Sequence, residues 1–283
     1  MLHYNKIGVI GLNNNGNTCY LNACLQLLSH SGKLTLNLYN YMKKKEKEKL
    51  TNIEKTLLYL IINKWFTNKI IYNPLKIQKE IAKENDLFNP LYCSQNDSSE
   101  SMIYIIDLLN DKFSKIFRSN IKNHLECNKC KQIRTSEEIF NIISVEVKHH
   151  INESIKSFLK KEKLEDKINC ENCKMKTKTN KKYEFNKLSD NLIIHLKRFK
   201  QINNRYIKDR SKIICPDYIT INKNNYELRG VIIHSGTIKG GHYYFIGKNL
   251  INIWYKYDDI LVKKLYNKDI INDGYIYYYE KIM

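Results

Sequence analysis

Cys19 lies where a polar, glycine-containing segment gives way to an apolar helical pattern. Residues 11–28 read GLNNNGNTCYLNACLQLL, and the apolar residues after Thr18 recur at helical spacing. A helix that begins at Thr18 places Cys19 in its first turn, where free backbone N–H groups and the helix dipole favour negative charge. We expect this position to lower the pKa of the thiol and to supply a nucleophile. The alternative is a buried structural cysteine, which does not need a turn-forming segment before it.

A second group of polar residues near the carboxyl end could complete such a site. Residues 234–245 read HSGTIKGGHYYF, and WYKYDD follows at 254–259. Adjacent strands would bring Asp258 beside His242, fix the tautomer of its ring and leave the other ring nitrogen for a thiol. An early cysteine, a late histidine and a following acid give the chain order of a papain-like thiol hydrolase. Two other histidines lie in apolar strand patterns and are interpreted as core or surface residues: His195 and His234.

Four of the eight cysteines form two C-x-x-C pairs, Cys127 with Cys130 and Cys170 with Cys173. Two such pairs supply the tetrahedral four-thiolate environment that Zn²⁺ prefers, and four thiolates leave no open position for water. The sequence therefore predicts one structural zinc ion. The alternatives are four free cysteines, or a zinc ribbon that binds nucleic acid through the surrounding lysines.

The chain of 283 residues has a formal net charge of +19, from 48 basic and 29 acidic side chains. This charge favours an acidic partner such as nucleic acid, although lysine, asparagine and isoleucine are frequent throughout the chain. The Lys-rich residues 43–50 are assigned no function. No stretch reaches the ~18 apolar residues that a membrane span requires, and the first residues do not resemble a signal peptide. We expect an intracellular monomer.

The period of the apolar residues changes near residue 118. Before it, helices are expected at 51–66, from Pro74 to Ala82, and at 97–117. After it, short alternating segments predict strands at 133–147, 183–199, 213–221, 228–235, 242–247 and 252–258. A helical part followed by a strand-rich part predicts a single α+β domain over residues 1–283.

These motifs together resemble the ubiquitin-specific proteases. The segment at 11–28 is similar to their cysteine box, and HSGTIKGGHYYF with WYKYDD is similar to their histidine box. Between them, LYCSQNDSSESMIYIIDLL at 91–109 resembles the Gln-Gln-Asp segment, and LSDNLIIHLKRF at 188–199 resembles the leucine-rich strand of the family. The cysteine pairs fall where the family has its fingers.

The resemblance implies a papain-like fold with a helical thumb (about 1–118), zinc-binding fingers (about 119–190) and a β-sheet palm (about 191–283). It assigns Cys19 as nucleophile, His242 as general base and then acid, and Asp258 as the orienting carboxylate. It assigns the side-chain amide of Asn14 to the oxyanion hole. Asp259 is a candidate accessory carboxylate.

The resemblance also implies a channel for the carboxyl-terminal tail of ubiquitin. Asp97 and Glu100 would contact the arginines of this tail, while Gly240, Gly241 and Tyr243 would form the walls around its terminal glycines. A strongly basic protein needs local acidic groups to accept a basic peptide. Three positions depart from the family pattern in this segment: Asn96, Ser99 and Ser101.

The function that follows is hydrolysis of the peptide or isopeptide bond after the terminal glycine of ubiquitin, by a deubiquitinase acting on polyubiquitin and ubiquitinated proteins. Three alternatives remain: a ubiquitin-binding pseudoenzyme, a protease for a ubiquitin-like modifier, and a nucleic-acid-binding zinc ribbon, whose affinity would fall steeply with salt.

Overall fold

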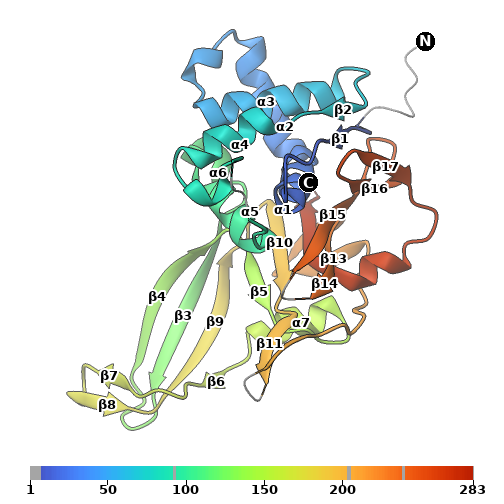
Figure 1. Cartoon of the computed structure of the whole chain (residues 1–283). Helices are drawn as coiled ribbons and strands as arrows, with labels where there is room; N and C mark the ends of the chain where they lie inside the picture. Colours follow the sequence, from blue (N-terminus) through green and yellow to red (C-terminus); the bar gives the residue numbers. More distant parts are fainter. Residues whose placement is uncertain (1–7, 92–93, 203–204, 238–239, 283) are drawn as a thin grey trace.

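The computed structural model describes residues 8–91, 94–202, 205–237 and 240–282; residues 92–93 and 238–239 of two of the motifs lie outside this range. Figure 1 shows helices at one end, a twisted sheet beside them, and a long sheet that projects away from both. We call these parts the thumb, the palm and the fingers. None of the helices in the described residues is long and apolar enough to cross a membrane.

The thumb is formed by residues before 118. Its elements are β1 (Gly11–Leu12), α1 (Cys19–Ser29), α2 (Gly32–Lys43), η2 (Lys47–Lys49), α3 (Asn52–Trp65), β2 (Ile71–Tyr72), α4 (Leu75–Ala82), η3 (Asp86–Phe88), α5 (Ser98–Asp107) and α6 (Asp111–Ser114). All 11 residues of α1 are buried, because α1 lies between the other thumb helices and strands β14, β15 and β16 of the palm. The helix that carries Cys19 is therefore the centre of the domain.

The remaining elements are β3 (Ser119–Cys127), β4 (Ile133–Phe140), β5 (Ile143–Val145), α7 (Ile151–Phe158), β6 (Glu162–Lys163), β7 (Ile168–Cys170), β8 (Met175–Thr177), β9 (Thr179–Lys187), β10 (Asn191–Leu196), β11 (Phe199–Ile202), β12 (Arg205–Lys208), β13 (Tyr218–Ile221), β14 (Asn224–Thr237), β15 (Gly240–Lys248), β16 (Trp254–Asp258), β17 (Leu261–Lys264), η4 (Asp269–Asp273) and β18 (Gly274–Lys281). The palm sheet has the order β17-β16-β15-β14-β18-β10-β5, with β13 paired to β14. The fingers have the order β4-β3-β9-β6 and carry the β7-β8 hairpin at their tip.

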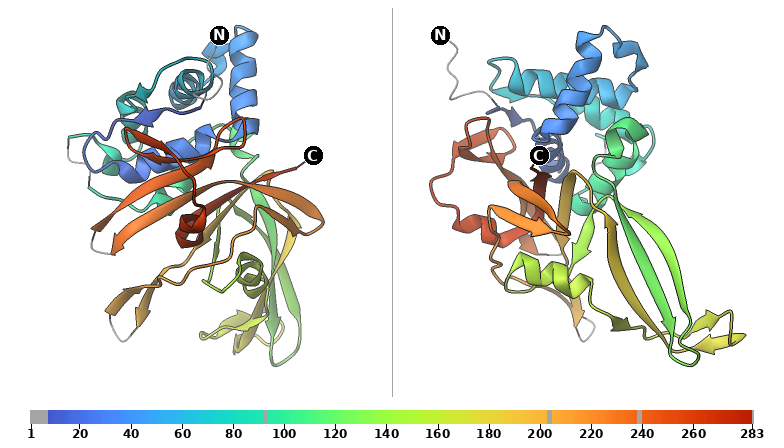
Figure 2. Two further views of the ribbon diagram at one scale, coloured as in Figure 1. Left: turned by 90° about the vertical axis from the view of Figure 1, so that its right-hand side faces the viewer. Right: turned by 180° about the vertical axis from the view of Figure 1, so that it is seen from behind.

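Two hydrophobic cores cover the two faces of the palm sheet, which Figure 2 shows edge-on and from behind. The first core joins the thumb helices to one face and includes Leu21, Phe113 and Phe245. The second core covers the opposite face and includes Ile155 of α7 and Tyr277 of β18. Because α1 belongs to the first core, packing of the thumb on the palm determines where Cys19 lies.

The helix expected at 51–66 is confirmed as α3, with a capping box between Thr51 and Glu54. The helix expected at 97–117 is wrong in its length, since α5 ends at Asp107 and the short α6 follows. The reason is tertiary: the buried carboxylate of Glu54 accepts hydrogen bonds from the backbone N–H (2.8 Å) and side-chain amide (3.0 Å) of Asn110. That backbone N–H is then unavailable to a continuing helix.

Three strand predictions also need correction. The expected strand at 183–199 divides into β9 and β10 at Ser189, whose backbone and hydroxyl bond to Ser119 and Asn191 where the fingers meet the palm. The strand expected at 213–221 begins only at Tyr218, after Pro216, which lacks a backbone donor. The segment expected at 133–147 forms β4 in the fingers and β5 in the palm.

The boundaries expected for the fingers, about 119–190, differ from the architecture in one respect. Strand β5 pairs in parallel with β10 of the palm sheet, and α7 packs against β5. The fingers are therefore made of two chain segments, one before β5 and one after α7. A local apolar pattern cannot distinguish the two sheets, because the assignment depends on which distant strand supplies the pairing.

Candidate active site

The loop before α1 is built by the side chain of Asn14. Its Oδ1 atom accepts hydrogen bonds from the backbone N–H groups of Gly16 and Thr18 and from the Thr18 hydroxyl, each at 3.1 Å. Gly16 has φ +90°, a conformation that side-chain-bearing residues rarely adopt. These bonds turn the chain into the first residue of α1, which is Cys19.

Cys19 is 3% exposed, and the backbone N–H of Tyr243 lies near enough to its thiol to influence the thiol pKa. Burial raises the pKa of this thiol, and the nearby charge of Asp259 adds to the increase. The N–H groups of Tyr243 and of the first helical turn act in the opposite direction but are outweighed. The expectation of a lowered thiol pKa is therefore wrong: the helix terminus contributes as predicted, yet desolvation dominates because α1 is buried.

His242 lies on β15 and Asp258 ends the neighbouring strand β16. The Nε2 atom of His242 is 2.5 Å from Oδ1 of Asp258, and Lys256 Nζ is 2.8 Å from the other carboxylate oxygen. Burial would raise the pKa of Asp258, but the hydrogen bonds from Lys256 and His242 outweigh it and hold the pKa below its ordinary value. A charged carboxylate at Nε2 keeps the proton on that nitrogen and leaves Nδ1 as the acceptor.

Asp259 has a different set of partners from Asp258. Its two carboxylate oxygens accept hydrogen bonds from the side-chain amides of Asn14 (2.9 Å) and Asn22 (2.8 Å). Its backbone carbonyl accepts from Leu12 N–H at 2.8 Å, and its φ is +50°. The sequence could not separate the two aspartates. In the structure one contacts the imidazole and the other holds the asparagine of the loop.

A cavity of about 400 Å³ lies between α5 and the β14-β15 hairpin. All five residues predicted for the ubiquitin tail line it: Asp97, Glu100, Gly240, Gly241 and Tyr243. A Cβ on Gly241 would lie 2.1 Å from Nε2 of His234, so only glycine fits there. Gln95 also lines the cavity, and its Oε1 atom accepts a hydrogen bond from the Gly241 N–H at 3.2 Å.

Several residues of this cavity were not predicted as site residues. They are Gln95, Asn96, Ser99, His195, Phe199, His234, Thr237 and Tyr275. Burial lowers the pKa of His195 and of His234 to about 4, so both rings are neutral at pH 7. From the sequence, His195 and His234 were interpreted as core or surface histidines. The alternation of apolar and polar residues around them predicts a strand but does not indicate that the strand borders a cavity.

The four paired cysteines meet at the tip of the fingers, where their sulfur atoms all lie within 4.8 Å of one another. The Sγ atoms of Cys127 and Cys173 are 3.9 Å apart, and those of Cys130 and Cys170 are 3.6 Å apart. A tetrahedron with Zn–S bonds of ~2.3 Å has sulfur–sulfur edges of about 3.8 Å. The cluster is therefore consistent with zinc binding.

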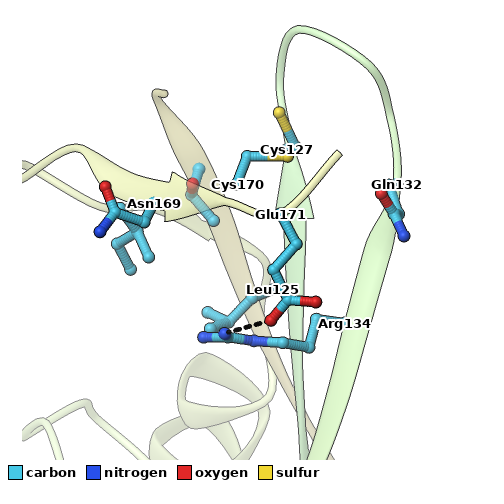
Figure 3. A pocket seen from close by; sticks show the side chains of 9 residues that line it. Leu125, Cys127, Gln132, Arg134, Asn169, Cys170 and Glu171 are labelled. Carbon is cyan, nitrogen blue, oxygen red and sulfur yellow. Dashed lines mark ion pairs between the residues drawn. The ribbon is translucent and has the colours of Figure 1, made fainter. Parts of the chain in front are cut away.

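Figure 3 shows Cys127 and Cys170 beside a small hollow of about 50 Å³. At its opposite side an ion pair of 3.6 Å joins Arg134 of β4 to Glu171. Glu171 lies in the sequence between Cys170 and Cys173. The side chains of Arg134 and Glu171 are more than half exposed, so this pair contributes little stability.

Comparisons with known proteins agree with this architecture. The family model described as ubiquitin carboxyl-terminal hydrolase matches residues 10–279. A probable ubiquitin carboxyl-terminal hydrolase 16 of Schizosaccharomyces pombe is 27% identical over 305 residues, covering 96% of this chain and 66% of the relative. Ubiquitin carboxyl-terminal hydrolase 12 of Salmo salar is 27% identical over 307 residues, covering 90% and 81%. The chain thus spans just under two thirds of the first relative.

Among solved structures, the SAGA DUB module Ubp8/Sgf11/Sus1/Sgf73 bound to monoubiquitin matches with a TM-score of 0.82 and 22% identity, covering 98% of this chain and 70% of the matched chain. The same module bound to ubiquitin aldehyde also has a TM-score of 0.82 and 22% identity, covering 100% and 72%. This likeness confirms the predicted papain-like α+β fold. Since the family model covers nearly the whole chain, this protein belongs to the ubiquitin carboxyl-terminal hydrolase family, as its sequence motifs predicted.

Proposed function

We propose that this chain is a thiol-dependent deubiquitinase that cleaves the bond after the carboxyl-terminal glycine of ubiquitin. One observation carries the proposal: Cys19 opens α1, which packs on strand β15, and His242 of that strand is paired with Asp258 of β16 at 2.5 Å. A nucleophile, a base and an orienting carboxylate thus come from three elements to one place. The short His242–Asp258 bond supports an imidazole that is oriented to act as a base.

In this mechanism Asp258 keeps the proton on Nε2 of His242, and Nδ1 accepts the proton of the Cys19 thiol. Because burial raises the pKa of Cys19, the thiol stays neutral until His242 removes its proton. The thiolate attacks the glycine carbonyl, and His242 then protonates the departing lysine amine. Water, deprotonated by the same imidazole, hydrolyses the thioester and regenerates the thiol.

The negative charge on the carbonyl oxygen requires fixed donors. Asn14 is suited to this role because Asp259 and the backbone of the loop restrain its amide from both ends. The amide nitrogen has two N–H bonds and Asp259 takes one of them, which leaves the other for an oxyanion. We assign Asn14 as the oxyanion donor and Asp259 as the residue that orients it.

We assign the four-cysteine cluster to one structural zinc ion. The support is geometric: the four sulfur atoms all lie within 4.8 Å of one another, which is the spacing that a four-thiolate zinc site needs. Bound zinc would supply a cross-link between the β3-β4 turn and the β7-β8 hairpin. It has no step in the hydrolysis.

Polyubiquitin and ubiquitinated proteins are the substrates that this function implies, in an intracellular setting and with the chain acting as a monomer. The basic charge leaves nucleic acid as a rival partner. Nucleic-acid binding does not explain the arrangement of Cys19, His242 and Asp258, whereas each of these residues has a role in the proposed hydrolysis.

The proposal is tested by incubating the protein with ubiquitin that carries an electrophilic carboxyl-terminal warhead, followed by intact mass and peptide mapping. We expect a single ubiquitin adduct on Cys19. A folded protein that binds ubiquitin without forming the adduct would support the pseudoenzyme instead. A protein that neither binds nor reacts would point to a ubiquitin-like modifier or to nucleic acid. An adduct with a ubiquitin-like modifier that carries the same warhead would indicate the first, and binding to nucleic acid would indicate the second.

Removing the metal is expected to unfold the fingers while the thumb and palm stay folded. Structural zinc contributes roughly 10 kcal/mol or more of apparent binding free energy in small zinc domains, and most of it is folding free energy. Hydrogen exchange after treatment with a chelator should show loss of protection in β3, β4 and β9, and none in α1. Unchanged protection of those strands, or purified protein without zinc, would contradict the assignment.

A further inference from the structure

Asp97 has its carboxylate filled by partners within the chain. At the start of α5, its Oδ1 atom accepts hydrogen bonds from the backbone N–H of Ser99 (2.7 Å), the Ser99 hydroxyl (2.5 Å) and the backbone N–H of Glu100 (3.2 Å). Its Oδ2 atom accepts from the hydroxyls of Tyr243 (3.0 Å) and Tyr275 (2.6 Å). A carboxylate offers about four lone-pair positions, so five donors leave none for a substrate arginine.

The two tyrosines come from the palm, and Asp97 comes from the thumb. Tyr243 lies on β15 and is 7% exposed, while Tyr275 lies on β18 and is 3% exposed. Their rings are 5.8 Å apart and lie in the first hydrophobic core. The carboxylate of Asp97 therefore joins α5 to two strands of the palm through two partly buried charge-assisted hydrogen bonds.

This junction is directly linked to the nucleophile. Helix α1, which starts at Cys19, packs on β15, and Tyr243 follows His242 in this strand. On the thumb side, the thiol of Cys24 in α1 donates to the carbonyl of Ser98, the residue after Asp97 (3.2 Å). A shift at Asp97 would thus change the position of Tyr243 relative to α1, and with it the distance between the sulfur and the imidazole.

We propose that Asp97 is a positioning residue that, through Tyr243 and Tyr275, sets the thumb against the palm and so aligns Cys19 with His242. We call the three side chains the Asp97 clamp. This inference rests on the proposed hydrolase function and changes the role that the resemblance gave to Asp97. Glu100, which is exposed at the same cavity, remains available to the arginines of the ubiquitin tail.

Tyr275→Phe is the direct test, because it removes one hydroxyl from the clamp and keeps the ring. The matched control is Tyr277→Phe in the same strand, which also removes a buried hydroxyl bond, to the Ile271 carbonyl, but does not contact Asp97. The readouts are kcat and KM for a ubiquitin substrate, and the rate of Cys19 alkylation by iodoacetamide without ubiquitin, followed on the Cys19 peptide from pH 6 to 10.

We expect Tyr275→Phe to lower kcat about tenfold with KM nearly unchanged, since small misplacements of reacting groups cost this much or more. The backbone N–H of Tyr243 lowers the thiol pKa, so moving Tyr243 away from Cys19 raises it further; alkylation should slow at neutral pH and its profile should move to higher pH. Tyr277→Phe should leave both readouts as in the unmodified protein. Asp97→Asn combined with Tyr275→Phe should lose less than the product of the single losses.

The clamp is wrong if Tyr275→Phe alkylates and turns over like the control, or if it raises KM alone. Alkylation does not involve ubiquitin, so the experiment can reject the Asp97 clamp without rejecting the hydrolase function, and the reverse. A shifted alkylation profile in a protein that never reacts with the ubiquitin warhead would retain the clamp and reject the hydrolase. Adduct formation with an unshifted profile and unchanged kcat would retain the hydrolase and reject the clamp.

Discussion

Replacing Cys19 with alanine is expected to abolish ubiquitin cleavage while leaving ubiquitin binding intact. In the proposed mechanism the thiol supplies the attacking atom, and removal of a nucleophile from a triad costs roughly 10⁶-fold in kcat. Its side chain is 3% exposed at the first turn of α1, so the substitution removes little contact surface. The dissociation constant for ubiquitin should change by no more than about threefold, ~0.7 kcal/mol. Steady-state turnover and titration calorimetry measure the two quantities.

Cys215→Ala is the control for this experiment. Cys215 lies outside the site, where its thiol contacts the hydroxyl of Tyr279 at 2.9 Å and burial raises its pKa to about 12. Turnover by this variant should match the unmodified protein. Cleavage by Cys19→Ala at the unmodified rate would reject Cys19 as nucleophile, and loss of turnover in both variants would indicate a general effect of removing a thiol.

The second large effect is expected at Asn14. Removing one oxyanion donor costs about 10²–10³-fold in kcat, or ~3–4 kcal/mol of transition-state stabilisation. We expect a loss of this size for Asn14→Ala. Asp259→Ala should give a comparable loss, because it frees the amide of Asn14 that the carboxylate holds at 2.9 Å. Substrate affinity should change little in either variant, since the interaction forms mainly in the transition state.

The double variant distinguishes a shared role from two separate ones. If Asp259 acts by orienting Asn14, the losses should not multiply, because the second substitution removes an interaction already lost. Asn15→Ala provides the matched control, since Asn15 is in the same loop as Asn14 but its side-chain amide donates to Asn73, which follows β2. Losses that multiply would show that Asp259 has an independent role, and a normal kcat for Asn14→Ala would remove it from the oxyanion site.

Much of the candidate site was accessible from residue types and spacing. The turn-forming run before Cys19, the two glycines before His242 and the paired cysteines each require a local chemistry that few other sequences supply. The helix at 51–66 was predictable for the same reason, because its capping box lies within four residues. Local interactions of this kind are encoded over a few positions and can be read without the fold.

The errors that matter most for the site depended on distant partners. The helix at 97–117 was predicted too long because Glu54, more than fifty residues earlier, takes the backbone N–H of Asn110. The thiol pKa was predicted in the wrong direction because the burial of Cys19 depends on strand β15, which is far away in the chain. Tyr275 was missed because a tyrosine in an aromatic strand gives no sign that its hydroxyl reaches a carboxylate of the thumb.

The sequence by itself therefore determined the family and its reaction class, and it supplied the candidate nucleophile, its candidate histidine and the candidate metal ligands, because each is a short pattern of residue types. Only the tertiary structure decided which aspartate serves the imidazole, what occupies the carboxylate of Asp97 and how the thiol is protonated. Those properties depend on distances and burial across the thumb–palm boundary. They arise when elements hundreds of residues apart pack together, and residue order alone does not contain them.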